Sequence, residues 1–190
     1  MIDANTAKAL DDFMARLETV HTSSGWPRLP YDPDWPSPCY QHTANGGVAV
    51  GWRPVRNAEG TDMFLRLAEA LELELHPDIV EFFSRYWSDP LPAQLPDGRH
   101  ICLLQAWNAE DMERLRSNLI GHALSKQKQK RPLTLFFGTL EPDSDLFLSL
   151  DNQNGSIWLE RPGKAPQEKL ADTMAEFLHS LTPLQIADQH

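Results

Sequence analysis

Cys39 is a possible nucleophile in this 190-residue chain, with His42 or His122 as its base. A cysteine attacks as its thiolate, which needs a neighbouring cation or base to form. Cys39 follows a proline-rich segment whose turn could expose it. Nothing in the sequence brings either histidine to it, so an inert, buried cysteine is the alternative that we favour. We therefore predict that the chain is not an enzyme.

Other signatures of catalysis or cofactor binding are missing. The seven histidines show no H-E-x-x-H or other paired spacing for zinc. Gly46-Gly47 precedes a strand, whereas a phosphate-binding loop precedes a helix. There is no G-x-S-x-G elbow. We expect no metal and no cofactor, and we interpret His122 as a largely buried core histidine with a hydrogen-bond partner.

Charge is distributed unevenly along the chain. The sequence has 17 basic and 27 acidic residues, a net charge of −10, which disfavours nucleic acid and anionic lipid surfaces as partners. Residues 59–113 contain twelve acids and three arginines, a net of −9, whereas residues 114–132 contain six basic residues and no acid. This polarity favours a basic partner, although solvated helix faces would produce the same pattern.

A helix is predicted from Glu110 to about Lys126. Asn108 can cap it, with Asp111 three residues on reaching back, and acids suit the first turn of a helix. Apolar residues then recur every three or four positions. The basic run 126–131 falls at the helix C-terminus, where cations complement the dipole, and we expect residues 114–131 to turn away from the acidic face.

The remaining pattern predicts an α+β fold, with helices packed against a largely antiparallel sheet in a single domain over residues 1–190. The predicted strands are short, mostly do not alternate with the helices, and end in a hairpin with the turn signal Asp151 to Gly155. The predicted helices cover residues 6–23, 62–71, 77–86, 110–126 and 170–181, and the predicted strands cover 47–52, 99–107, 133–140, 146–150 and 156–160.

Two segments lie outside these elements. Residues 26–38 are rich in proline and form an extended arm, which Trp26, Tyr31 and Trp35 should hold against the domain. Residues 184–190 are predicted to be a flexible tail. Cys39 and Cys102 form no C-x-x-C pair, and no apolar run approaches the roughly 18 residues of a membrane span. We expect reduced thiols in a cytosolic protein that does not insert into lipid.

Motifs along nearly the whole chain resemble one family, the SecY-interacting protein Syd family of the SUKH superfamily. The motifs are Ser37-Pro38-Cys39, Trp52-Arg53-Pro54, Leu103-Leu104-Gln105-Ala106-Trp107, Glu110-Asp111, Asn118-Leu119-Ile120-Gly121-His122, Lys126 to Pro132-Leu133-Thr134-Leu135-Phe136, Thr139-Leu140-Glu141, Leu170-Ala171 and Ala175-Glu176-Phe177-Leu178.

The resemblance implies a SUKH-like fold and a cytoplasmic protein held at the inner face of a bacterial plasma membrane by cytosolic loops of SecY. Such proteins check or restrain improperly assembled translocon and dock SecY on an acidic concave surface. SecY loops are basic under the positive-inside rule, which suits the acidic segment. A toxin-neutralising immunity protein of the same superfamily is the alternative, and we favour a monomer. The predicted binding residues are Glu69, Glu72, Glu74, Asp78, Glu81, Asp89, Glu110, Asp111, Glu113 and Glu141.

Overall fold

The turn after Asp151 forms the hairpin that its sequence predicts. The Asp151 carboxylate accepts a hydrogen bond from the Gln153 amide at 2.8 Å, and Gly155 takes the left-handed conformation with φ 77°. In the computed structural model, which describes residues 5–142 and 145–190, this turn joins β8 (Phe147–Asp151) to β9 (Ile157–Glu160). The two strands pair antiparallel, with Leu148 opposite Leu159.

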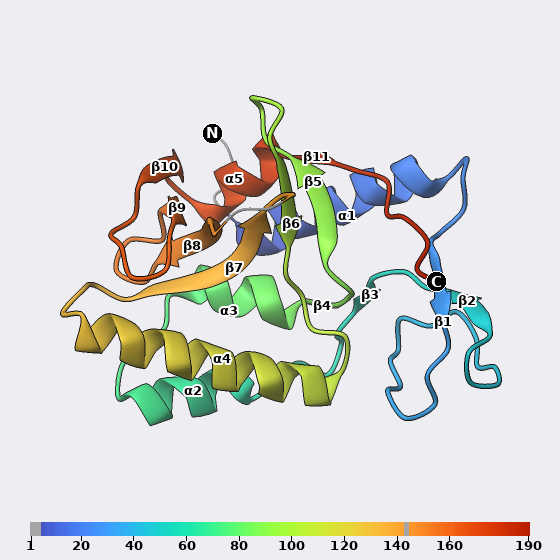
Figure 1. The fold of residues 1–190 in the computed structure, drawn as a ribbon, viewed down its shortest axis with the longest axis horizontal. Helices are drawn as coiled ribbons and strands as arrows, with labels where there is room; N and C mark the ends of the chain where they lie inside the picture. Colours follow the sequence, from blue (N-terminus) through green and yellow to red (C-terminus); the bar gives the residue numbers. More distant parts are fainter. Residues whose placement is uncertain (1–4, 143–144) are drawn as a thin grey trace.

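The hairpin belongs to a curled antiparallel sheet of seven strands, in the order β10-β9-β8-β7-β6-β5-β11 (Figure 1). The fold class predicted from the sequence is therefore confirmed. The other strands of this sheet are β5 (Leu91–Gln94), β6 (His100–Leu103), β7 (Thr134–Leu140), β10 (Glu168–Ala171) and β11 (Thr182–Pro183).

One face of the sheet forms the main core with three helices: α1 (Thr6–His21), α3 (Pro77–Ser84) and α5 (Met174–Ser180). Phe137 on β7 is fully buried between them. Its ring contacts Phe82 of α3 at 5.2 Å and Phe177 of α5 at 5.7 Å between centroids. These edge-on contacts fix the two helices on the same side of the strand.

The other face of the sheet is covered over β7–β9 by α4 (Ala109–Lys128). His122 contacts the rings of Phe136 and Phe147 edge-on, and Lys126 forms an ion pair with Glu160 of β9. Beside α4 lies α2 (Met63–Leu71), running in the same direction (Figure 1). α4 covers only part of this face of the sheet. The part of β6 that lies beside the N-terminus of α4 therefore stays accessible.

Several elements differ from the sequence prediction. The helix expected over 77–86 ends at Ser84, because Tyr86 and Trp87 form β4 and pair with β3 (Val55–Arg56). The helix expected over 170–181 begins only at Met174. Residues 168–171 form β10, and the Thr173 hydroxyl caps α5 by accepting a hydrogen bond from the Glu176 amide at 3.1 Å.

The proline-rich arm contains β1 (Arg28–Pro30), which pairs with β2 (Ala49–Gly51). Trp26 stacks on His21 of α1 at 4.8 Å, and Tyr31 contacts Tyr40 at the same centroid distance. Trp35 packs against the core as a partly buried side chain. Each of the three aromatic residues named from the sequence thus contacts another part of the domain.

Residues 184–190, predicted to be a flexible tail, instead lie along the domain. The chain passes α1 and ends near β1 (Figure 1). Ile186 is buried, and its amide donates to Nε2 of His21 at 3.2 Å. The Gln189 amide donates to the carbonyl of Arg28 at 2.8 Å. These bonds and the buried side chain hold a segment whose polar composition gave no sign of packing.

Among the residues that the structure describes, no helix has the length and apolar character needed to cross a membrane.

Candidate functional site: an acidic groove

The N-terminus of α4 borders an open groove and has the cap that its sequence predicts. The Asn108 side chain accepts a hydrogen bond from the Asp111 amide at 2.8 Å, and the Asp111 carboxylate accepts one from the Trp107 amide at 2.9 Å. The two side chains satisfy backbone donors on both sides of the helix start. Asp111 is therefore held in place by the backbone.

The floor of this groove continues onto the outer face of β6. Ile101 and Leu103 point into the core, so strand alternation places Cys102 and Leu104 on the opposite face. Cys102 pairs with Thr139 of β7, whose hydroxyl donates to the Glu141 carboxylate at 2.9 Å. Leu104 lines the groove itself, which has a volume of about 850 Å³. We call this cavity, with Asp32, Asp89 and Asp111 among its lining residues, the acidic groove.

Asp89 is a half-buried carboxylate of the acidic groove. Burial raises its pKa, and the negative charge of Asp111 raises it further, while a hydrogen bond from Gln189 at 2.9 Å lowers it. Burial also raises the pKa of Cys102 to about 11, with Glu141 and Asp89 contributing to the rise. Of the acids named from the sequence, Asp89 and Asp111 therefore line the acidic groove, whereas Glu141 contributes to the charge around Cys102 without lining the groove.

Aromatic side chains from the arm, and Tyr40 just beyond it, also line the acidic groove. Tyr31, Trp35 and Tyr40 line it, and Tyr40 contacts Trp107 edge-on at 5.2 Å. The Arg114 guanidinium lies 5.6 Å from the Trp35 ring centre, within the range of a cation–π contact. This arginine was expected to turn away from the acidic face, but it lines the acidic groove because the arm places an aromatic ring beside it.

The other predicted acids fall into two groups. Glu69, Glu72 and Glu74 are exposed at the C-terminal end of α2 and just beyond it. Asp78, Glu81 and Glu113 interact with neighbouring side chains instead. Asp78 lies 3.8 Å from Nδ1 of His76, Glu81 pairs with Arg85 at 2.9 Å, and Glu113 pairs with Arg66 and Arg116.

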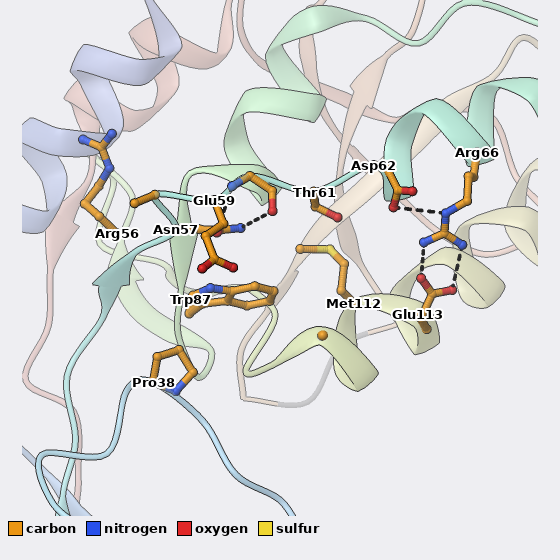
Figure 2. Close-up of a pocket in the computed structure, with 13 residues that line it drawn as sticks. Pro38, Arg56, Asn57, Glu59, Thr61, Asp62, Arg66, Trp87, Met112 and Glu113 are labelled. Carbon is orange, nitrogen blue, oxygen red and sulfur yellow. Dashed lines mark hydrogen bonds and ion pairs between the residues drawn. The ribbon is translucent and has the colours of Figure 1, made fainter.

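Glu110 is an exposed acid in the first turn of α4. Residues of this turn line two cavities, because Asp111 faces the acidic groove whereas Met112 and Glu113 line a second cavity (Figure 2). Hydrogen bonds from Arg66 and Arg116 lower the pKa of Glu113 to about 2. Of the predicted acids, Asp89 and Asp111 line the acidic groove, while Glu110 and Glu141 are exposed and are not among the residues that line either cavity.

Acidic residues outside the predicted set also line these cavities. Asp32, in the proline-rich arm, lines the acidic groove, while Glu59 and Asp62 line the second cavity. The latter two belong to the strongly negative segment 59–113, so the charge pattern contained a signal for them. Asp32 had no such signal, because its position depends on how the arm folds back.

The basic end of α4 departs from the prediction at Lys126. Its side chain is buried, with 6% exposed, and its ammonium pairs with Glu160, which is fully buried. Lys126 follows Leu119 and Ala123 at helical spacing, so it lies on the buried face of α4 and not among the solvated cations.

His122 is half-buried, against a prediction of a largely buried side chain. Nε2 lies 3.3 Å from the Thr134 hydroxyl, and burial lowers the pKa of the imidazole. It lines a cavity of about 200 Å³ together with Lys126 and Arg161. These neighbours are cationic, and no cysteine lines this cavity.

Cys39 does not have the surroundings of a catalytic cysteine. It is buried, and its amide donates to the Ser37 hydroxyl at 3.1 Å. Burial raises the pKa of its thiol to about 12. His42 instead contacts the carbonyl of Thr43, its neighbour in sequence. In residues 5–142 and 145–190, no cluster of three His, Cys, Asp or Glu side chains is arranged for a metal ion.

The fold and the groove together define a curled α+β domain with an open acidic groove. Residues 7–183 match the family model for the Syd protein (SUKH-2). The chain is 45% identical over 181 residues to Protein Syd of Pseudoalteromonas atlantica, covering 93% of this chain and 95% of that protein. It is 42% identical to the protein of the same name from Alteromonas mediterranea, covering 92% and 94%, and 42% identical to that of Shewanella frigidimarina, covering 94% and 82%.

The chain belongs to the Syd protein family. The name of these relatives refers to no reaction.

Proposed function

We propose that this protein binds basic cytosolic loops of SecY in the acidic groove and thereby restrains or checks improperly assembled translocon. Membership of the Syd family supports the partner. The observation that carries the proposal is that two half-buried carboxylates, Asp89 and Asp111, line one open groove. Among the residues that the structure describes, their only ion pair is a 3.9 Å contact of Asp111 with Arg114. A bound lysine or arginine would relieve their repulsion, because an opposite charge at close range favours the ionised carboxylate.

Long-range attraction supports the same partner. The acids on this surface and the net charge of −10 would steer a basic loop towards the acidic groove. Such steering weakens as salt screens it beyond roughly 8 Å at physiological ionic strength. Raising the salt concentration should therefore slow association with SecY more than it speeds release.

The proposal includes a location and an assembly. The protein would act as a monomer held at the cytoplasmic face of the bacterial inner membrane by SecY, without inserting into lipid or binding nucleic acid. Because SecY is embedded in the membrane, a basic loop reaching out from it would suffice to recruit the protein.

Capture of detergent-solubilised SecY complex at low salt tests this function. The test variant carries Glu110→Lys and Glu141→Lys, which reverse charges at the edge of the acidic groove and on the β6 face. The matched control carries Glu69→Lys and Glu74→Lys, two exposed acids at the end of α2, and changes the total charge equally. We expect the control to retain SecY and the test variant to lose most of it.

Two results would contradict the proposal. The first is that the wild-type protein captures no SecY at low salt. The second is that the α2 control loses SecY while the test variant, shown by its melting curve to be folded, keeps it.

A further inference from the structure

The second cavity contains a partly accessible aromatic ring and an exposed carboxylate to which no role has yet been assigned. It has a volume of about 950 Å³ and lies between the β3–α2 loop and the first turn of α4. We call it the Trp87 pocket, because Figure 2 shows the Trp87 indole in its centre with Pro38 and Met112 beside it. Trp87 is half-buried, so part of the ring stays accessible.

The charged residues of the Trp87 pocket differ in whether they have partners. Arg66 is engaged by Asp62 at 3.2 Å and by Glu113. Arg56 lies 3.6 Å from Asp11 of α1. Glu59, by contrast, is exposed and has no ion-pair partner among the residues that the structure describes. In Figure 2 its carboxylate lies beside the indole of Trp87.

An indole next to an unpaired carboxylate suits a cation. The face of a tryptophan ring attracts an ammonium or guanidinium, and a carboxylate at the same place adds an ion pair. An anion would meet Glu59 and Asp62, and a purely apolar group would leave the carboxylate unpartnered. The chemistry therefore matches the side chain of an arginine or lysine.

The Trp87 pocket and the acidic groove share the first turn of α4. Trp107 and Asp111 line the groove, Ala109, Met112 and Glu113 line the pocket, and the exposed Glu110 belongs to the same turn. An extended basic segment in the acidic groove could therefore pass this turn and place one more side chain in the pocket.

We propose that the binding site is bipartite, and that the Trp87 pocket holds one basic side chain of the same partner loop that occupies the acidic groove. This inference rests on the proposed function, because it assigns a second anchor to the same partner. Trp87 and Glu59 would contact the partner directly, while Arg66 would keep Glu113 and Asp62 occupied at the end of the pocket.

Fluorine NMR of protein labelled with 5-fluorotryptophan tests the inference without SecY. A tetra-arginine peptide with blocked termini is the probe, and its uncharged tetra-citrulline counterpart is the control. Trp87→Phe assigns the Trp87 resonance. We expect this resonance to shift with tetra-arginine and not with tetra-citrulline, and Glu59→Gln to weaken the response by about three- to fivefold. Glu72→Gln, an exposed acid on α2, should leave it unchanged.

Variants of the Trp87 pocket should also weaken SecY capture, each to a different extent. Trp87→Leu should weaken capture by about three- to tenfold without abolishing it, because a single cation–π contact is removed. Glu59→Gln should have a smaller effect and serves as the variant that does not disturb packing, since the side chain is exposed.

Two results separate this inference from the proposed function. A Trp87 resonance that does not move at saturating tetra-arginine, while SecY is still captured, would overturn the bipartite site and leave the proposed function standing. A Trp87 resonance that shifts, in a protein that captures no SecY, would leave the cation pocket in place and refute SecY as its partner.

Discussion

Replacing Lys126 by methionine should destabilise the fold strongly, although the sequence places Lys126 in a run of cations at a helix end. The ammonium of Lys126 pairs with the fully buried carboxylate of Glu160. Methionine has a similar length and no charge, so Lys126→Met would leave Glu160 as a buried charge without a partner. Breaking one side of a buried pair lowers the free energy of unfolding by about 3–5 kcal/mol.

For a chain of this size, each kcal/mol shifts the melting temperature by about 2–4 °C, so the expected decrease is roughly 6–20 °C. The assay is urea denaturation at pH 7, with thermal melting alongside. Lys128→Met is the matched control, because Lys128 is exposed two residues further along the same helix. Its effect should stay within about 0.5 kcal/mol.

The double variant Lys126→Met with Glu160→Leu removes both charges. Oε2 of Glu160 is buried and accepts no hydrogen bond in the part of the chain that the structure describes. The pair is therefore incompletely satisfied, and the double variant should recover most of the stability lost by the single variant. The reasoning would be refuted if Lys126→Met unfolded within 1 kcal/mol of the wild-type protein.

Four further predictions concern individual positions. Burial raises the pKa of Asp89 in the folded protein, so its stabilising contribution is present below the unfolded pKa and is lost as pH rises through the folded pKa. Asp89→Asn should therefore stabilise the fold in urea at pH 7, lose this advantage at about pH 3, and weaken SecY capture. The thiol of Cys39, with its pKa raised to about 12, should react with iodoacetamide only after unfolding, and rapid labelling of the native protein near pH 8 would contradict this. A Cβ at Gly138 would lie 2.7 Å from the carbonyl oxygen of Cys102, so Gly138→Ala should lower the free energy of unfolding by about 1–3 kcal/mol. Gly121→Ala, in the open middle of α4, should raise it by about 0.5–1 kcal/mol.

The sequence predicted correctly those features whose hydrogen bonds join residues close together in the chain. The Asn108 cap and the Asp151–Gly155 turn depend on side chains next to the backbone they bind, so the sequence contains the whole interaction. The two-residue strands β3 and β4 form only because residues 55–56 and 86–87 meet in the fold. Proline also obscured β5 and the edge strand β11, since it removes a ladder donor.

The sequence predicted the negative charge of the candidate site, but it identified only some of the residues that line the groove. The negative segment included Asp89 and Asp111, which line the acidic groove, but also Glu81 and Glu113, which lie outside it and pair with arginines at close range. Asp111 itself lies 3.9 Å from Arg114. Periodicity identifies the buried face of a helix but not the partner of each charge. The position of Asp32 depended on the arm and could not be read from composition.

Site-specific photo-crosslinking tests most directly whether SecY occupies the acidic groove. A benzoylphenylalanine at Pro90, an exposed residue that lines the groove, is compared with one at Ala70, an exposed residue of α2. Both proteins are irradiated with detergent-solubilised SecY complex at low salt after their melting curves have shown that they are folded. We predict a crosslink to SecY from position 90 and none from position 70. A crosslink from position 70 alone would show that the partner binds another face, and the acidic groove would then not be the docking site.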